Sequence, residues 1–286
     1  MILVLGQTGY MGTQFINELK YRNLSYRGIS RGNINYCNYS VLYSLLTTDV
    51  ARNNFELVIN CAGYIGRPNV DACEDHKAET IEGNVVLPKM LSDVCSDVGI
   101  KFMQISSGCI YDGYEKVYTE EDEPNFSFKY NNCSFYSGCK ALAEDLIDKD
   151  NSYICRLRIP FDEFDNSRNY LSKLKNYDKL LNAENSISHR GDFVKACLDL
   201  YEMNCATGIY NIVNSGSATT SWVAQKLAQY NIRNDFNFFQ DEKEFYEFGA
   251  KAPRSNCLLD NSKLLSAGVK IRETKEAIEE SLEKWT

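Results

Sequence analysis

Tyr136 and Lys140 are four residues apart in the stretch Ser-Phe-Tyr-Ser-Gly-Cys-Lys, residues 134–140. Side chains at this spacing share one face of an α-helix, so the phenol and the ammonium point the same way. A fixed cation lowers the pKa of a phenol from its ordinary value of about 10, so the phenol can protonate a carbonyl oxygen during hydride transfer. Tyr136 is the only tyrosine with a lysine four places on, and the competing interpretation is a surface pair on an amphipathic helix.

A glycine-rich turn at residues 6–12 follows an apolar run at residues 2–5. Its glycines are three apart, which lets the backbone turn tightly and brings the N–H groups of a helix N-terminus against a pyrophosphate. A glycine triplet alone is a weak signal, but its place directly after a strand favours a dinucleotide site. The residues expected at this site are Gly6, Thr8, Gly9, Tyr10, Met11 and Gly12.

The end of the second expected strand indicates which dinucleotide binds. A NAD-type site has an acidic residue there, about 20 residues past the glycines, to hold the ribose 2′-hydroxyl. This chain instead has Gly-Ile-Ser-Arg at residues 28–31, and a hydroxyl with a guanidinium suits a 2′-phosphate. We therefore expect NADP(H), with Arg31 at the 2′-phosphate. The alternative is that Arg31 is an ordinary exposed loop residue.

Polar and small residues end two of the expected strands. Ser107 follows the apolar run at residues 101–106, at the edge that should face the nicotinamide, where its hydroxyl would polarise a substrate carbonyl. Asn60, Ala62 and Gly63 end the preceding strand and would line the cofactor. The competing interpretation of this second group is a simple strand-to-loop turn.

Positioning these residues requires strands that alternate with helices. Apolar runs typical of strands and segments with helical spacing follow one another through residues 2–5, 12–19, 55–60, 85–94, 101–106, 136–147 and 153–159. This alternation predicts a parallel sheet with helices on both faces. The expected fold class is α/β, a Rossmann-type doubly wound sheet.

The pattern loosens after Pro160. Helices are expected at residues 168–181, 221–230 and 273–285, and a strand at residues 208–213. We predict an NADP(H)-binding domain at residues 1–160 that carries the catalytic tyrosine and lysine. Residues 161–286 are expected to form mainly a smaller substrate-binding region, interwoven with the first because no flexible linker separates them. Ligands should bind in the cleft outside the carboxyl ends of the strands.

The composition limits the classes of function. The 286 residues are 44% hydrophobic and 24% charged with a net charge of −8, which is typical of a globular protein and argues against nucleic-acid binding. The eleven cysteines include no C-x-x-C pair and there are two histidines, so we expect reduced thiols and no metal site. No apolar run has membrane length, and we expect a cytoplasmic protein without a membrane partner.

Several stretches resemble the extended short-chain dehydrogenase/reductases, in particular the dTDP-4-dehydrorhamnose reductase branch. The resemblance is closer still to the bifunctional nucleotide-rhamnose synthases. It runs over nearly the whole chain and is much more specific than the glycine-rich turn. The stretches that carry it are residues 66–71 with 73–74, 105–111, 121–126, 168–173 and 252–256.

The resemblance implies a 3,5-epimerase/4-reductase that converts UDP-4-keto-6-deoxy-D-glucose to UDP-L-rhamnose with NADPH. Both epimerised carbons adjoin the C4 ketone, so removal of either proton gives an enolate that Tyr136 and Ser107 could stabilise. Inversion needs acid/base groups on opposite faces of the sugar, and the resemblance points to Cys109 and Lys173. Without it, Cys109 would be interpreted as a small core residue and Lys173 as a solvated helix residue.

The resemblance also implies substrate contacts. Arg254 could bind the nucleotide diphosphate, the alternative being a surface salt bridge, and Asn169 is a weaker candidate. One departure is Ser107, where the related enzymes usually carry threonine; serine supplies the same hydroxyl. Two other functions stay open: a reductase without epimerase activity, and a regulatory subunit that binds NADP(H) without turnover. For the assembly of the chain, a homodimer is one alternative.

Overall fold

A computed structural model describes residues 1–53 and 55–286, with side chains for all of these except 49–53. Its centre is a six-stranded sheet in the order β2-β1-β3-β4-β6-β8, and every neighbouring pair is parallel. The strands are β1 (Ile2–Leu5), β2 (Tyr26–Ile29), β3 (Leu57–Asn60), β4 (Lys101–Ser107), β6 (Ser152–Leu157) and β8 (Gly208–Asn211). The strand order reverses next to β1, where open α/β sheets bind ligands at the carboxyl ends of their strands.

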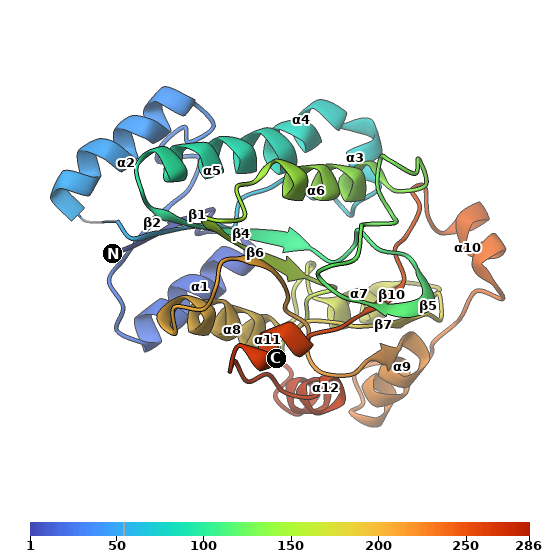
Figure 1. Cartoon of the computed structure of the whole chain (residues 1–286). Coiled ribbons are helices and arrows are strands. Elements are labelled where there is room, and N and C mark those ends of the chain that lie inside the picture. Colours follow the sequence, from blue (N-terminus) through green and yellow to red (C-terminus); the bar gives the residue numbers. More distant parts are fainter. Residues whose placement is uncertain (54) are drawn as a thin grey trace.

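Helices cover both faces of this sheet (Figure 1). On one face lie α2 (Tyr39–Asn53), α5 (Leu87–Asp97) and α6 (Phe135–Leu146), with α3 (Ala72–Asp75), α4 (Lys77–Ile81) and the π-helical turn η1 (Glu82–Val86) preceding α5. On the other lie α1 (Tyr10–Tyr21) and α8 (Arg190–Glu202). The predicted α/β, Rossmann-type fold class is confirmed.

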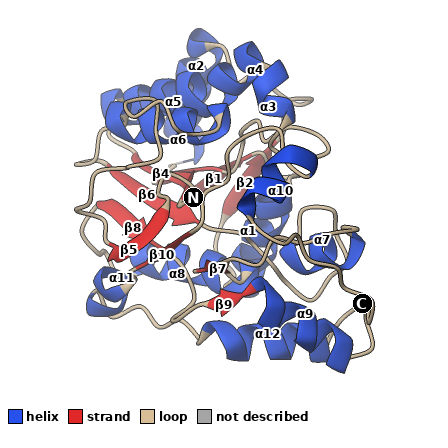
Figure 2. Ribbon diagram, turned by 90° about the vertical axis from the view of Figure 1, so that its right-hand side faces the viewer, coloured by secondary structure: helices blue, strands red, loops and turns tan. Residues whose placement is uncertain are grey.

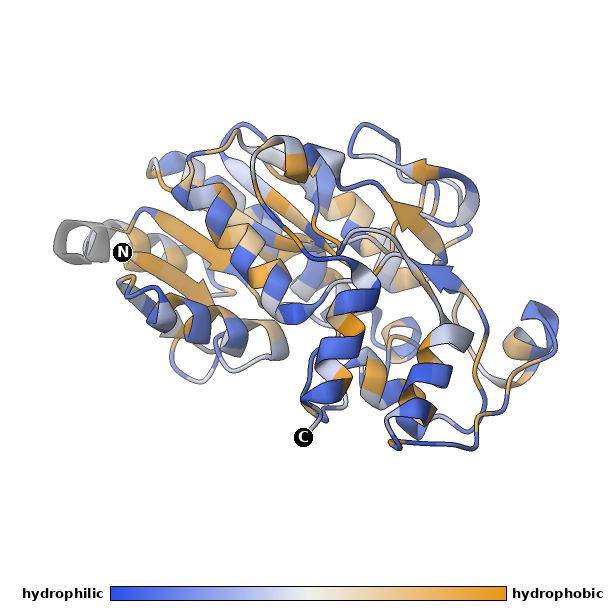
Figure 3. Cartoon of the chain, turned by 90° about the horizontal axis from the view of Figure 1, so that it is seen from below, coloured by the Kyte–Doolittle hydropathy of each residue, from blue (hydrophilic) through white to orange (hydrophobic). Residues whose placement is uncertain are grey.

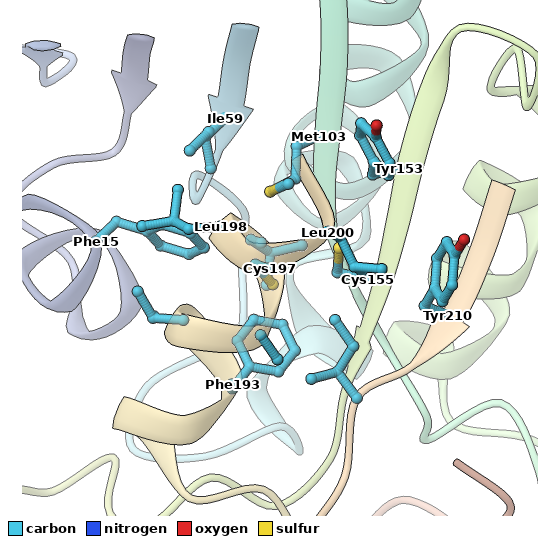
Figure 4. Close-up of a cluster of buried hydrophobic side chains, with 14 of the residues drawn as sticks. Phe15, Ile59, Met103, Tyr153, Cys155, Phe193, Cys197, Leu198, Leu200 and Tyr210 are labelled. Atoms are coloured by element: carbon cyan, nitrogen blue, oxygen red, sulfur yellow. The ribbon is translucent and has the colours of Figure 1, made fainter. Parts of the chain in front are cut away.

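Each face of the sheet has its own hydrophobic core. The core under α1 and α8 includes Phe15 and Phe193, both fully buried, together with Cys155 and Cys197 (Figure 4). The core under α2 and α5 includes Leu91 and Phe102. The strands near the N-terminus are hydrophobic along their length, whereas the helices alternate hydrophobic and hydrophilic residues (Figure 3). This is the pattern of a sheet buried on both faces.

The second half of the chain contributes to the central sheet and also forms a smaller region (Figure 2). Its β8 pairs with β6, whereas β7 pairs antiparallel with β9, and β10 pairs in parallel with β5. These further elements are β5 (Gly113–Tyr118), α7 (Tyr170–Asn176), β7 (Glu184–Asn185), β9 (Ala218–Thr219), α9 (Thr220–Gln229), α10 (Glu242–Phe248), β10 (Cys257–Leu259), α11 (Ser262–Ser266) and α12 (Thr274–Glu283). The domain boundary at residue 160 stays a prediction.

One expected element needs correction. The helix predicted at residues 168–181 is the shorter α7, which ends where Tyr177 adopts an extended backbone. Several elements were not predicted, among them α2, α8, α10 and the strand pair β5–β10. Among the described residues, no helix is both long and apolar enough to cross a membrane.

Candidate active site

Helix α6 holds the phenol and the amine on one face. Its first turn is capped twice: the Ser134 hydroxyl accepts from Ser137 N at 3.2 Å, and Glu74 Oε1 accepts from Phe135 N at 2.7 Å. The Lys140 Nζ lies 5.8 Å from the Tyr136 ring centroid and donates to Ile105 O of β4 at 3.3 Å. The helix is thus fixed against the end of β4, where the catalytic side chains were expected.

The pKa values of this pair differ from the expectation. Burial raises the pKa of Tyr136 above its ordinary value, and the nearby Cys109 adds to the rise, while a hydrogen bond with Ser107 opposes it. Burial also lowers the pKa of Lys140 to about 8, against the attraction of Glu144. The expected acidification of the phenol is therefore wrong for this structure, because burial is the largest influence on its pKa and raises it. A phenol that stays protonated at neutral pH is the form that donates a proton.

Ser107 at the end of β4 lies beside the phenol. Its side chain is buried, it lies close enough to Tyr136 to lower the pKa of the phenol, and its hydroxyl accepts from Cys109 N at 3.1 Å. The loop after β4 is thereby turned so that residues 107 and 109 stand on the same side as Tyr136. The structure thus brings four of the five expected catalytic residues, Tyr136, Lys140, Ser107 and Cys109, into one group.

Lys173 approaches this group from α7. Burial lowers the pKa of Lys173, the positive charge of Arg168 lowers it further, and Cys109 has the opposite effect. Cys109 affects the pKa of Tyr136 and also that of Lys173, so it lies within electrostatic reach of both side chains. The arrangement can place two different proton carriers, a thiol and an amine, beside one carbonyl-binding pair.

Arg168 is a residue of this site to which we assigned no role from the sequence. Its Nη2 donates to Gly66 O at 3.0 Å, and its charge acts on Tyr136 and Lys173. Burial lowers the pKa of Arg168, and Arg67 lowers it further. The only sequence signal was its place in the stretch 168–173.

The two expected substrate contacts differ in their surroundings. The Arg254 Nη2 lies 2.8 Å from Asp71 Oδ2, so the salt bridge that we weighed as an alternative is formed, although the side chain stays partly exposed. The Asn169 side chain is fully buried; it caps α7 by accepting from Leu171 N and donates to Asp162 and Phe164. Because its amide is committed to these protein groups, we leave Asn169 out of the substrate contacts proposed below.

The glycine-rich turn has no space for larger residues. Gly6 has a φ of +76°, and a Cβ on Gly12 would lie 2.1 Å from Gly6 O. Gly9 N donates to that same oxygen at 2.9 Å, and Gly9 precedes α1, whose first residues are Tyr10 and Met11. Thr8 is exposed beside them. This is the cradle of backbone N–H groups at a helix N-terminus that a pyrophosphate requires.

The turn after β3 is held from two sides. Asn60 is buried between Gln104, to which its Nδ2 donates at 2.8 Å, and Ala62 N, which donates to its Oδ1 at 3.0 Å. On the other side Asn84 of η1 binds both the N–H and the carbonyl of Tyr64. A Cβ on Gly63 would lie 2.9 Å from the Asn84 Oδ1. Asn84 was not found from the sequence, because an isolated asparagine in a helical pattern gives no signal.

Arg31 lies at the carboxyl end of β2. It lines a small hollow with Cys37, Tyr64, Gly83 and two carboxylates, Glu79 and Glu82. The preceding Ser30 donates through its hydroxyl to Asn33 Oδ1 at 2.7 Å, which fixes the turn. Arg31 thus follows the carboxyl end of β2, which pairs with β1, and its side chain lines this hollow. Across the described residues, no cluster of three or more metal-binding side chains occurs.

Known proteins resemble the chain over its whole length. The computed structure superimposes on a UDP-rhamnose synthase from Acanthamoeba polyphaga mimivirus with a TM-score of 0.88 at 22% identity, covering 99% of this chain and 98% of that one. It also superimposes on a dTDP-4-dehydrorhamnose reductase from Bacillus anthracis in complex with NADP, with a TM-score of 0.79 at 19% identity, covering 99% and 97%. Structures of such low identity establish the fold.

Sequence relatives establish the family. The chain is 33% identical over 231 residues to a bifunctional dTDP-4-dehydrorhamnose 3,5-epimerase/dTDP-4-dehydrorhamnose reductase of Arabidopsis thaliana, covering 77% of this chain and 74% of the relative. It is 31% identical over 285 residues to a trifunctional UDP-glucose 4,6-dehydratase/UDP-4-keto-6-deoxy-D-glucose 3,5-epimerase/UDP-4-keto-L-rhamnose-reductase of that plant. That match covers 96% of this chain but only 40% of the relative. The family model of the RmlD substrate binding domain matches residues 1–286, and the chain belongs to this family.

Proposed function

We propose that the protein is an NADPH-dependent reductase of a 4-keto nucleotide sugar that also epimerises its substrate at C3 and C5. The observation that carries the proposal is the group formed by Tyr136, Ser107, Cys109 and Lys173 at the carboxyl end of the central sheet. The reductase part is supported by the family and by both relatives described above. The epimerase part depends on the thiol and the amine.

The glycine-rich turn and Arg31 fit the cofactor. NADPH, when bound, supplies a hydride to the C4 carbon of the sugar. The backbone N–H groups between Gly9 and Gly12 would bind its pyrophosphate, and the close packing of these glycines leaves room for that approach. Arg31 would bind the 2′-phosphate, and Asn60, Ala62 and Gly63 would line the cofactor pocket. The Bacillus anthracis reductase was crystallised with NADP, which agrees with this choice.

In the reduction, Tyr136 donates its phenolic proton to the C4 oxygen as the carbon receives the hydride. Ser107 donates a hydrogen bond to the same oxygen and stabilises the charge that develops on it. The Lys140 ammonium, on the same face of α6, stabilises the phenolate that Tyr136 becomes.

In each epimerisation, one of Cys109 and Lys173 removes the proton next to the ketone and leaves an enolate at C4. The other returns a proton to the opposite face of the same carbon, so the atoms balance and the configuration inverts. Burial and neighbouring cations lower the pKa of Lys173, which helps a lysine to exchange protons near neutral pH. Tyr136 and Ser107 stabilise the enolate oxygen as they do the alkoxide.

The proposed substrate is UDP-4-keto-6-deoxy-D-glucose and the product UDP-L-rhamnose. Arg254 would bind the diphosphate, exchanging part of its salt bridge with Asp71 for the ligand. The trifunctional plant relative is named for this UDP sugar, and the chain spans about two fifths of its length. A homodimer and a cytoplasmic location stay predictions.

The test of the proposal is turnover of the keto-sugar in deuterium oxide. UDP-4-keto-6-deoxyglucose and NADPH should give loss of the near-ultraviolet absorbance of NADPH together with deuterium at C3 and C5 of the product. Tyr136→Phe should lose reduction, since the proton donor is gone. Full turnover by that variant would refute the reductase mechanism. NADPH binding without any turnover by the wild type would favour a regulatory subunit.

Cys109→Ala separates the two activities. It should reduce a pre-epimerised ketone at a rate close to that of the wild type, but incorporate little deuterium at C3 and C5. Unchanged incorporation would refute the role of Cys109. A wild type that reduces the pre-epimerised ketone without exchange would be a reductase without epimerase activity.

A further inference from the structure

Arg158 is a fully buried arginine immediately after β6. Its Nη1 donates to Gly108 O at 3.2 Å, to Ser255 Oγ at 3.0 Å and to Cys109 Sγ at 3.5 Å. Its Nη2 donates to Ser255 O at 3.0 Å and to Asn185 Oδ1. The guanidinium is therefore held in one orientation by three separate segments, and that orientation places an N–H group on the Cys109 thiol.

Arg158 has no carboxylate partner, in contrast to the arginine two residues before it. Arg156 is equally buried and forms an ion pair with Glu144 at 2.8 Å. Among the side chains that the structure describes, no carboxylate lies at ion-pair distance from Arg158, and its Nε is buried without a hydrogen bond. Asp112 lies within electrostatic reach of Arg158 but forms no ion pair with it. A buried guanidinium whose direct contacts are all neutral is costly, so a negative charge that forms on one of those contacts is stabilised.

Cys109 Sγ is the contact of Arg158 that can acquire such a charge. The other acceptors of the guanidinium are two carbonyls, an amide and a hydroxyl, which stay neutral. A guanidinium in contact with sulfur favours the thiolate over the thiol. The main chain of Cys109 is fixed as well, because its N–H donates to Ser107 Oγ.

We propose that Arg158 is a positioning residue for epimerisation: it orients Cys109 and stabilises the thiolate that alternates with the thiol as protons move to and from the sugar. This proposal rests on the proposed function. When Cys109 removes a proton from carbon, it starts as the thiolate and ends as the thiol. When it donates a proton, the order is reversed and the guanidinium balances the charge left on sulfur. Reduction at C4 does not require this step.

Alkylation of Cys109 by iodoacetamide, followed by peptide mass spectrometry as a function of pH, tests the charge contact without substrate. Arg158→Met keeps the aliphatic stem but removes the charge beside sulfur, so Cys109 should be alkylated more slowly than in the wild type. Arg158→Lys keeps a charge and should give an intermediate rate. The titratable and charged groups near Cys109 or Arg158 are Tyr136, Lys140, Lys173, Cys257, Asp112 and Tyr114, all retained in both variants.

The kinetic test compares exchange with reduction. Arg158→Met should slow deuterium incorporation at C3 and C5 at least about tenfold while reduction of the pre-epimerised ketone changes little, and Arg158→Lys should restore part of the exchange. The proposal would be overturned if Arg158→Met incorporated deuterium at C3 and C5 as fast as the wild type and if its Cys109 were alkylated as in the wild type. A parallel loss of both activities in a folded Arg158→Lys protein would also overturn it, because the role would then be structural. Absence of exchange in the wild type would contradict the proposed function instead, and the alkylation profile would still test Arg158.

Discussion

The protonation state of a buried lysine determines how the proposed reduction depends on pH. Lys140 lies beside Tyr136 on α6, is only 6% exposed, and donates to a carbonyl of β4. Burial lowers its pKa to about 8, so the ammonium form dominates below that pH and the neutral amine above it. The charge that would stabilise a tyrosinate is therefore lost as the pH rises.

We expect kcat/KM for reduction to be level below pH 8 and to fall about tenfold per unit above it. The side chain of the Lys140→Arg variant stays protonated throughout this pH range. The kcat/KM that this variant retains should therefore not decrease above pH 8. The pH profiles of the wild type and of Lys140→Arg are measured from initial rates with the pre-epimerised ketone. A wild-type profile that stays level well above pH 8 would remove Lys140 from the step.

Ser107 offers a second test on a single side chain. Ser107→Ala removes a donor to the C4 oxygen, and loss of one such donor typically lowers kcat by about 10²-fold. Ser107→Thr restores the hydroxyl found in the related enzymes and should stay within a few-fold of the wild type. Single-turnover rates distinguish these outcomes from a change in binding. Equal losses in both variants would indicate a packing effect of the position.

At the scale of elements, the first turn of α1 depends on glycines packed against each other. A Cβ on Gly12 would overlap Gly6 O at 2.1 Å, whereas a Cβ on Gly32 would meet only Ser30 Oγ at 3.9 Å. Gly12→Ala must therefore displace the turn that the cofactor pyrophosphate would contact. Gly32→Ala is the matched control in a nearby loop.

We expect Gly12→Ala to weaken NADPH binding at least about tenfold, measured by fluorescence titration, because the backbone N–H groups move away from the pyrophosphate. Gly32→Ala should bind NADPH as the wild type does. Equal binding by Gly12→Ala would mean that the pyrophosphate does not approach this turn.

The elements that the sequence predicts are those with local signals. The glycine-rich turn, the strands β1, β3, β4 and β6, and α6 follow from apolar runs and from helical spacing. Helix α7 was predicted too long, because Lys175 and Leu180 continue a helical pattern that the tertiary structure ends at Asn176. Propensity and pattern do not record such long-range effects.

The site shows the same division between local and distant signals. The Tyr136–Lys140 pair could be found because its spacing is a helix period. Arg158 could not be found from the sequence, because its partner Cys109 is 49 residues away. An arginine at the end of a strand is also common in proteins and indicates no particular role. The raised pKa of Tyr136 was also missed, since the extent of burial is a property of the folded chain.

At the scale of the whole molecule, a charged cluster joins distant parts of the second half. Arg272 binds Asp192 of α8 through two nitrogens and contacts His189, while Asn214, after β8, donates to Asp192 at 2.7 Å. Burial alone would raise the pKa of Asp192, but the contacts with His189 and Arg272 outweigh it and lower that pKa to about 2. The cluster fixes α8 relative to the segment that leads into α12.

Because this folded-state pKa lies below the ordinary value of 3.8, the charged Asp192 stabilises the protein above pH 4, and its contribution disappears as the pH falls toward 2. Asp192→Asn should lower the free energy of unfolding at pH 7 by about 2 kcal/mol. Urea titrations at several pH values should show the difference from the wild type shrinking below pH 4. A difference that is independent of pH would assign the effect to packing.

The parallel pairing of β6 with β8 has a consequence for biosynthesis of the chain. Among the described residues, the free edge of β6 pairs with Gly208–Asn211, and α8 is the main element after residue 160 that contributes to the core under α1. A nascent chain that has emerged only as far as Pro160 therefore exposes an open strand edge and an apolar sheet face, both prone to self-association. An isolated fragment 1–160 should aggregate where the entire chain does not, and co-translational folding should wait for the segment around residue 211.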